Sequence, residues 1–113
     1  LAENQELRYL HVWFEPTSSA QYLYIRVYIN YSASAKSDWV AKSDGTPGVT
    51  MPAASATDIK VDLSNADGYA RVPLDLDMHR VIEVEFEIIE PGVDLEMIGF
   101  AIDGMADELE NML

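Results

Sequence analysis

Apolar and polar residues alternate with a period of two along most of the chain. Residues 7–14 and 21–31 show the pattern most fully, since each run carries mainly aliphatic side chains on one side and aromatic or polar side chains on the other. Successive side chains of a strand point to opposite faces, so this period predicts strands rather than helices. β-branched and aromatic residues, which suit a pleated sheet, fill both runs. We therefore expect the chain to be mainly β.

Three later segments repeat the alternation, and they cover residues 59–63, 69–76 and 81–89, while residues 93–102 can supply a last strand. Within the second of them Pro73 has no amide hydrogen to donate, which predicts an edge strand or an irregularity there. Six or seven short strands with little helix are typical of two antiparallel sheets packed face to face. The pattern thus predicts a jelly-roll-like antiparallel β-sandwich, with residues 1–113 forming a single domain.

The segment 16–20 between the first two strands is short and rich in turn residues. A connection of this kind predicts that strands 7–14 and 21–31 pair as an antiparallel hairpin. If their aliphatic sides stay together, their aromatic and polar sides also share one face. The expected cross-strand neighbours are then Trp13 with Tyr24, His11 with Arg26, and Tyr9 with Tyr28.

Irregular structure is expected in the middle of the chain and at its C-terminal end. Residues 32–56 are rich in Ser, Ala, Gly and Pro, which predicts a long loop with one short strand around Trp39 and Val40. Residues 64–68, with the sequence Ser-Asn-Ala-Asp-Gly, predict a tight turn. Asp103 could N-cap a short helix, the only helix expected. That helix would carry Met105, Leu109 and Met112 on one side.

The composition is that of a folded domain. Hydrophobic residues make up 49% and charged residues 24% of the 113 residues, which argues against disorder. No apolar run reaches the roughly 20 residues that a membrane-spanning helix needs, and no signal peptide is recognisable. Because the sequence begins at Leu1, we expect a processed chain or a module of a longer protein. The absence of cysteine excludes disulfides and thiolate sites.

Charge is distributed unevenly along the chain. The formal net charge is −13, yet residues 1–56 contain five acids against four bases and residues 57–113 contain fifteen against three. Eight of the eleven aromatic residues lie in the first, nearly neutral half. A chain this negative repels nucleic-acid phosphate and anionic membranes, and neither is therefore an expected partner. The repulsion does not argue against an inhibitor that mimics DNA.

Sequence motifs of known catalytic sites are absent. The chain has no Gly-rich phosphate loop, no nucleophile elbow and no zinc-protease helix motif. Its twenty Asp and Glu residues bring some carboxylates together by chance, so carboxylate pairs are weak grounds for acid–base catalysis. We expect a protein that binds a partner and is not an enzyme.

Two groups of residues are candidate cation sites. Asp75, Asp77 and His79 alternate, so on a strand they would share one face and could hold a divalent metal, but a solvated strand end is the favoured interpretation. Residues 62–68 have the composition of a calcium loop, but the glycine is misplaced and no glutamate closes the loop. An Asx-type turn is favoured there. No motif supports a structural calcium ion, and no other cofactor is expected.

The aromatic and polar sides of the first two strands carry the residues best suited to binding. Tyr and Trp offer flat apolar area with a polar tip and lose little entropy when a partner fixes them. A pyranose presents C–H groups on its face and hydroxyls on its rim, so it can stack on such rings while polar neighbours bond its rim. The candidate ligand-binding residues are Tyr9, His11, Trp13, Tyr22, Tyr24, Arg26 and Tyr28, with Asn30 as a polar neighbour and Trp39 as a further platform.

The same rings would also fit strands that are covered on both faces, in which case they belong to the core. Arg26 and His11 lie in the middle of the set and favour exposure, since burying an unpaired arginine costs several kcal/mol. A neighbouring carboxylate could satisfy both residues, so the two interpretations stay open.

With these residues in place, the chain resembles the β-sandwich carbohydrate-binding modules of secreted bacterial enzymes that degrade plant cell walls. The resemblance rests on size, strand count, the side formed by Trp13, Tyr24, Arg26 and Tyr28, and the closing run Met-Ile-Gly-Phe-Ala-Ile-Asp-Gly at residues 97–104. It implies a secreted, non-catalytic domain next to other modules of a parent chain. The implied partner is a polysaccharide such as a plant cell-wall glucan or hemicellulose, held by those four side chains.

Two other classes of protein fit the same sequence. An acidic inhibitor or immunity-type protein would bind a basic partner through its carboxylates, which here are Glu83, Glu85, Glu87, Asp94 and Glu96. Such binding would depend strongly on salt, whereas glycan binding would not. A structural or capsid-type sandwich would instead use its aromatic side as an oligomer interface.

Overall fold

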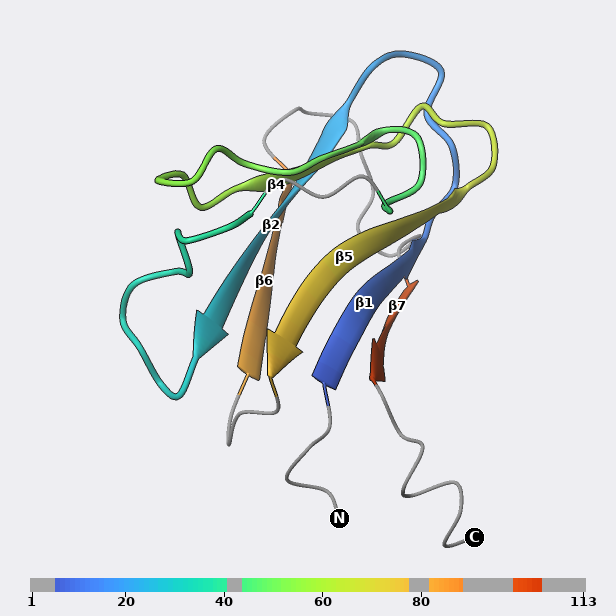
Figure 1. The fold of residues 1–113 in the computed structure, drawn as a ribbon. Coiled ribbons are helices and arrows are strands. Elements are labelled where there is room, and N and C mark those ends of the chain that lie inside the picture. The colour runs from blue at the N-terminus through green and yellow to red at the C-terminus, as the bar shows by residue number, and fades with distance from the viewer. Residues whose placement is uncertain (1–5, 41–43, 78–81, 89–98, 105–113) are drawn as a thin grey trace, which may run out of the picture.

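The computed structural model of the chain describes residues 6–40, 44–77, 82–88 and 99–104. These residues form seven strands and no helix, which confirms the expected mainly β class (Figure 1). Accordingly, the described residues contain no helix that could cross a membrane. In chain order the strands are β1 (Glu6–Trp13), β2 (Tyr22–Ile29), β3 (Val49–Thr50), β4 (Ile59–Asp62), β5 (Tyr69–Asp77), β6 (Ile82–Ile88) and β7 (Gly99–Gly104).

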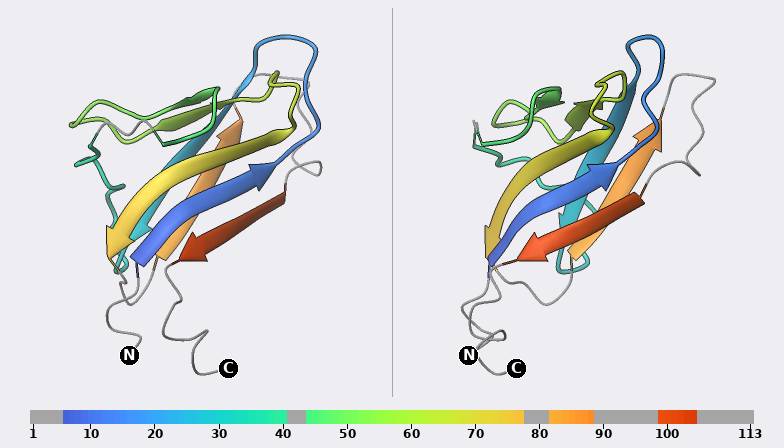
Figure 2. Two further views of the ribbon diagram at one scale, coloured as in Figure 1. Left: turned by 45° about the vertical axis from the view of Figure 1, so that its right-hand side comes forward. Right: turned by 90° about the vertical axis from the view of Figure 1, so that its right-hand side faces the viewer.

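The strands form two antiparallel sheets that pack face to face. Three strands in the order β5-β1-β7 make the first sheet, and four strands in the order β3-β4-β2-β6 make the second. Figure 2 shows them as two layers, with β5, β1 and β7 on one side of the molecule and β2 and β6 on the other. This is the β-sandwich that the alternating pattern predicts.

The core lies between the sheets and consists of the aliphatic sides of the strands. Each fully buried valine, leucine or isoleucine side chain contributes about 1.5–3 kcal/mol to the free energy of folding. The almost fully buried strand residues are Leu10, Val12, Leu23, Ile25, Val27, Ile59, Val61, Ala70, Val72, Pro73, Leu74 and Leu76. On β6 the apolar residues pack against this core and the glutamates between them are exposed, as expected. The opposite sides of the same strands therefore form the two outer faces of the sandwich.

The expected hairpin between the first two strands is wrong. β1 pairs with β5 and β7, whereas β2 pairs with β4 and β6, so the two strands lie in different sheets. The connection crosses between the layers and is held by hydrogen bonds from Phe14 N to Gly68 O, 2.9 Å, and from Thr17 N to Leu63 O, 2.8 Å. β1 and β2 lie in opposite layers and turn their aliphatic sides toward each other. The aliphatic side of each strand is therefore buried in the space between the sheets.

The long middle segment differs from the expectation in two details. Trp39 and Val40 do not form a strand, and the only strand that the described part of residues 32–56 contains is β3. Downstream, the expected tight turn is confirmed. Gly68 has a positive φ of 63°, which glycine adopts without strain, and its amide donates to Asn65 O. The Asp62 carboxylate accepts hydrogen bonds from the amide and hydroxyl of Ser64, so this is the favoured Asx-type turn.

The proline-containing strand and the chain end complete the fold. β5 is an edge strand, and the register of its pairing with β1 shifts between Leu7 and Tyr9, opposite the segment that contains Pro73. Both outcomes match the prediction from the proline. β7 continues through Asp103 to Gly104, so Asp103 does not cap a helix. The rest of the expected helix, and residues 93–98 of the expected last strand, lie outside the described residues.

Candidate functional site

The candidate ligand-binding residues lie on two opposite outer faces of the sandwich. Tyr9, His11 and Trp13 point outward from β1, whereas the candidates at positions 22–28 point outward from β2 in the other sheet. None of these side chains belongs to the core: Trp13 is 48% exposed and the others are half-buried. The expected neighbours across a β1–β2 hairpin are therefore on opposite sides of the molecule.

Trp39 is not a platform for a ligand, contrary to the expectation. Its side chain is only 3% exposed and belongs to the hydrophobic core. The indole Nε1 donates a hydrogen bond to Lys36 O at 3.0 Å, and Lys36 Nζ lies 4.8 Å from the ring centroid. These contacts fix the ring inside the fold, because a buried indole N–H needs an acceptor and finds one in the local backbone.

The outer face of β5 and β1 carries a continuous group of rings, which we call the aromatic face (Tyr9, His11, Trp13, Tyr69 and Arg71). Trp13 is the cross-strand partner of Tyr69, and His11 is the partner of Arg71. The His11 ring lies 5.9 Å from the Trp13 ring and 5.9 Å from the Tyr69 ring, stacked on both. Its Nδ1 is 2.6 Å from the Tyr69 hydroxyl. Rings packed in this way hold one another in place.

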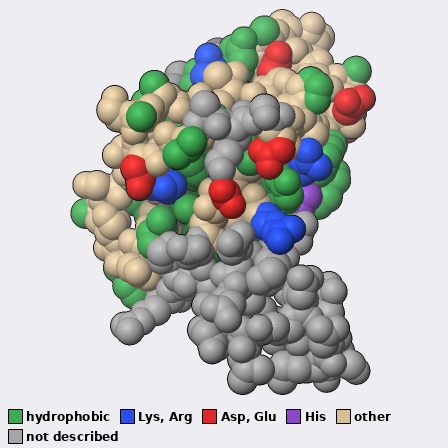
Figure 3. Space-filling model, in the orientation of Figure 1, with side chains coloured by type: hydrophobic (Ala, Val, Ile, Leu, Met, Phe, Trp, Pro, Cys, Tyr) green, Lys and Arg blue, Asp and Glu red, His purple; other side chains and the backbone are tan. Residues whose placement is uncertain are grey.

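Polar groups border the aromatic face near Tyr9. The Tyr9 hydroxyl donates to Asp44 Oδ2 at 3.0 Å, and Arg71 lies 4.8 Å from the Tyr9 ring while donating from Nε to Asp44 O at 3.1 Å. The hydrogen bond to the Asp44 carboxylate raises the pKa of Tyr9. Thr46 adds backbone and hydroxyl hydrogen bonds to Arg71, which tie this loop to the edge of β5. In Figure 3 the histidine, in purple, borders hydrophobic and basic side chains at this side of the molecule.

Tyr69 and Arg71 were not among the candidates from the sequence. The signal was present, because they alternate with the buried Ala70 and Val72 and must therefore point outward from β5. Only the pairing of β5 with β1 brings them beside Trp13 and His11.

The outer face of β2 and β6 is dominated by carboxylates, and we call it the carboxylate face (Tyr24, Arg26, Tyr28, Glu83, Glu85 and Glu87). Arg26 lies at its centre and donates to three carboxylates: Nε to Glu85 Oε1 at 2.8 Å, Nη2 to Glu87 Oε1 at 2.7 Å, and Nη1 to Asp58 Oδ2 at 3.1 Å. The Arg26 side chain is 17% exposed. Neighbouring carboxylates therefore satisfy the largely buried guanidinium of Arg26, which the sequence analysis had left open.

Tyr28 is bound into the same network. The Tyr28 hydroxyl donates to Glu85 Oε1 at 2.8 Å, and Glu85 raises the pKa of that phenol. Hydrogen bonding from Arg26 holds the pKa of Glu85 below its usual range. Tyr24 is the cross-strand partner of Glu87 on one side, and at the strand's start the Tyr22 ring lies 4.2 Å from Lys60 Nζ. The Tyr28 and Tyr22 side chains therefore already have partners within the protein.

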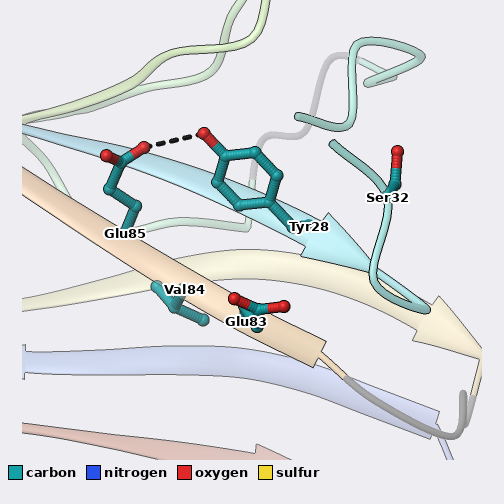
Figure 4. A pocket seen from close by; sticks show the side chains of 5 residues that line it. All are labelled: Tyr28, Ser32, Glu83, Val84 and Glu85. Atoms are coloured by element: carbon teal, nitrogen blue, oxygen red, sulfur yellow. Dashed lines mark hydrogen bonds between the residues drawn. The ribbon is translucent and has the colours of Figure 1, made fainter. Parts of the chain in front are cut away.

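A shallow pocket of about 430 Å³ opens at one end of the carboxylate face, and Tyr28, Ser32, Glu83, Val84 and Glu85 line it. Figure 4 shows the Tyr28 ring lying toward Glu85, with Glu83 further along the same strand. Glu83 makes no hydrogen bond or ion pair with another described residue. Among the described side chains no group of three or more His, Asp or Glu could hold a metal, and Asp77 and His79 of the candidate metal set fall outside them.

Comparison of the chain with known protein families, with curated proteins and with solved structures found no match.

Proposed function

We propose that this chain is a non-catalytic carbohydrate-binding domain and that it holds a polysaccharide on the aromatic face. The observation that carries the proposal is a half-exposed tryptophan, Trp13, fixed beside His11 and Tyr69 on the outside of a sheet. A tryptophan in such a place leaves apolar area in water, which favours a partner that covers it.

The chemistry of a sugar ring matches this face. The C–H face of a pyranose would stack on Trp13, and its hydroxyls would reach polar groups at the border of the rings, such as Arg71 and the Tyr69 hydroxyl. The rings lose little entropy on binding, since their neighbours and the sheet already hold them. No metal or cofactor is required for this mode of binding.

The proposal narrows the set of ligand-binding residues expected from the sequence. Tyr22, Tyr24, Arg26 and Tyr28 lie on the opposite face and cannot touch a sugar that stacks on Trp13. We retain Tyr9, His11 and Trp13 from the expected set and add Tyr69 and Arg71. Location outside the cell, attachment to other modules, and a plant cell-wall glucan or hemicellulose as the partner belong to the same proposal.

A second candidate function is the binding of a basic protein through the carboxylate face. The specific observation in its favour is the pocket beside Tyr28, where Glu83 has no described partner and an aromatic ring is at hand. A lysine or arginine side chain suits such a pocket, because carboxylates and ring faces both attract cations. Binding of this kind would weaken steeply with added salt.

Affinity electrophoresis in native gels that contain cellulose derivatives, xylan, mannan, β-glucan or pectin tests the first proposal. We expect retarded migration in at least one gel, unchanged by added salt and lost in Trp13→Ala. Unchanged migration in every gel would refute carbohydrate binding for these polymers. Retardation that survives Trp13→Ala but disappears in a Glu83→Gln, Glu85→Gln double variant would place the polysaccharide-binding site on the carboxylate face.

A further inference from the structure

The sandwich is closed along β5 and open along β7. The inward side chains of β5 are almost fully buried. On β7, Phe100 is the cross-strand partner of Val12, and Ile102 is the partner of Leu10. Since Leu10 and Val12 are buried between the sheets, both side chains of β7 point inward as well. Even so, Phe100 is 57% and Ile102 is 38% exposed, so the space between the sheets is open to water on this side.

The strand β6 forms the other border of this opening. The Phe86 and Phe100 rings lie 4.8 Å apart, and Figure 2 shows β6 and β7 at the same side of the two layers. The inward side chains of β6 are only half-buried. Together these apolar side chains form a row that we call the open edge (Ile82, Val84, Phe86, Ile88, Phe100 and Ile102). An apolar row left in water is typical of a surface that contacts another molecule.

The backbone of β6 is free on the same side. Among the described residues β2 is the only strand that pairs with β6, which is the last strand of its sheet. An edge strand presents N–H and C=O groups that an extended segment can pair with. Successive side chains of such a segment alternate between the two faces of the sheet, so every second one would cover the open edge.

The outward side chains of β6 determine which charge the added segment carries. Glu83, Glu85 and Glu87 are exposed and would lie beside the outward side chains of that segment. Three carboxylates share the single cation of Arg26, and Glu83 has no bonded partner among the described residues. Negative charge is therefore in excess, which favours lysine or arginine at these positions of the segment.

Neither a second copy nor the end of the same chain offers that charge. Pairing of β6 with β6 of another copy would set glutamates against glutamates, and like charges directly opposite each other are destabilising. Residues 105–113 contain three acids and no base. The complementary occupant is a segment of a different, basic protein.

We propose that the open edge binds an extended segment of a basic protein, which adds to β6 as a further strand. Its apolar residues cover the open edge, and its lysines or arginines lie beside the glutamates of β6. The proposal deepens the second candidate function and rests on it, since it names the form in which the basic partner binds. It does not involve the aromatic face.

Fluorescence anisotropy of the full chain with labelled seven-residue peptides, the length of β6, tests the proposal. The first peptide alternates lysine and valine, the second has the same composition in two blocks, and the third alternates glutamate and valine. At low salt we expect the first to bind at least about tenfold more tightly than the others, because only it places valines on the open edge and lysines beside the glutamates.

Variants of β7 locate the site. Phe100→Ala should weaken binding of the alternating lysine peptide by about tenfold, because it removes exposed apolar area that the peptide covers. Ile102→Ala is a second variant with the same direction of change. Val40→Ala, at a position that is 67% exposed outside the strands, is the matched control and should bind as the wild type.

The outcomes separate this proposal from the function on which it rests. If both lysine peptides bind equally and Glu83→Gln weakens both, binding of a basic partner stands and the added strand is wrong. Normal binding by Phe100→Ala and Ile102→Ala would also overturn the open edge as the site. If neither lysine peptide binds at low salt, the open-edge proposal and the second candidate function fall together.

Other occupants would be recognised in the free protein. A dimer in light scattering, with no peptide bound, would place a second copy on the open edge. Slow hydrogen exchange of the β6 amides that point away from β2, in a monomer that binds no peptide, would place another segment of the same chain there. Either result overturns the proposal, and carbohydrate binding is tested separately by the Trp13→Ala gels.

Discussion

Both outer faces of this sandwich carry aromatic and charged side chains, but the two faces differ in how far those side chains are bonded to other residues of the protein. On the carboxylate face, Arg26 is bonded to Asp58, Glu85 and Glu87, and Tyr28 to Glu85. On the aromatic face, Trp13 makes ring contacts and remains 48% exposed. The Tyr28 hydroxyl is thus already bonded within the protein, whereas about half of the Trp13 side chain remains in water.

The difference arises from which strands are neighbours. β6 places a glutamate opposite each outward residue from Tyr24 to Tyr28, and both Arg26 and Tyr28 donate hydrogen bonds to carboxylates of that strand. β7 places glycine and alanine opposite Trp13 and His11. The first face is consequently a network of hydrogen bonds and ion pairs, and the second leaves Trp13 half exposed.

The largest effect that would sharpen this comparison is on glycan affinity. Trp13→Ala should reduce affinity about 30-fold or more, since truncation of a central tryptophan at an interface costs about 2–4 kcal/mol. Tyr24→Ala is the matched control on the opposite face and should leave glycan affinity unchanged. Titration calorimetry measures both. Equal losses in the two variants would contradict the division between the faces.

The next effect is on stability. Arg26→Met should lower the free energy of unfolding by about 2 kcal/mol, because it leaves three neighbouring carboxylates without their cation and replaces charged hydrogen bonds. Urea denaturation followed by tryptophan fluorescence measures this change, and glycan affinity should be retained. A stable Arg26→Met variant that no longer binds glycan would place the site on the carboxylate face.

A smaller effect concerns the pH dependence of stability. The pKa of Glu85 is lowered by Arg26 and that of Asp58 chiefly by a hydrogen bond from Thr57, so both carboxylates favour the folded state when they are ionised. Their contribution is complete above the unfolded pKa of about 4 and is lost as the pH falls through the lower folded value. The melting temperatures of the wild type and Glu85→Gln should therefore differ at pH 7 and converge on acidification. A difference that grows at low pH would contradict the network.

The smallest effect is on two phenols. Asp44→Asn should lower the pKa of Tyr9 toward its ordinary value, and Glu85→Gln should do the same for Tyr28, because each carboxylate hydrogen bond disfavours the phenolate. NMR titration of the tyrosine ring carbons measures each pKa. If neither pKa moves, the hydrogen bonds from these hydroxyls do not form in solution.

Strand positions could be predicted from the sequence because the period of two is a local property. β1, β2, β4, β5 and β6 lie where the alternation of apolar and polar residues places them, and the turn before Gly68 follows from its own residues. β7 overlaps the expected last strand at residues 99–102. The aliphatic residues that alternate with Trp13 and with Tyr28 enter the core, as the pattern predicts. The pattern left open whether the rings on the other side of each strand are covered, because it is the same for a strand that is buried on both faces.

The pairing of strands could not be predicted in this way. A connection such as residues 14–21 can join two strands of one sheet or two strands of opposite sheets, and the aliphatic pattern is the same for both. The burial of Trp39 was also hidden, because the residues around it alternate neither as a strand nor as a helix, and its acceptor is a backbone oxygen at Lys36. Both errors concern contacts between distant segments or backbone atoms, which residue types alone do not encode.

The central claim is that the glycan lies on the aromatic face, and the two tryptophans offer the most direct measurement. In a two-dimensional ¹H–¹⁵N NMR titration with the oligosaccharide that binds best, the indole signal of Trp13 should shift while that of Trp39, buried and bonded to Lys36 O, stays in place. Trp13→Phe assigns the two signals. Shifts confined to amides of β2 and β6, with the Trp13 indole unchanged, would contradict the account.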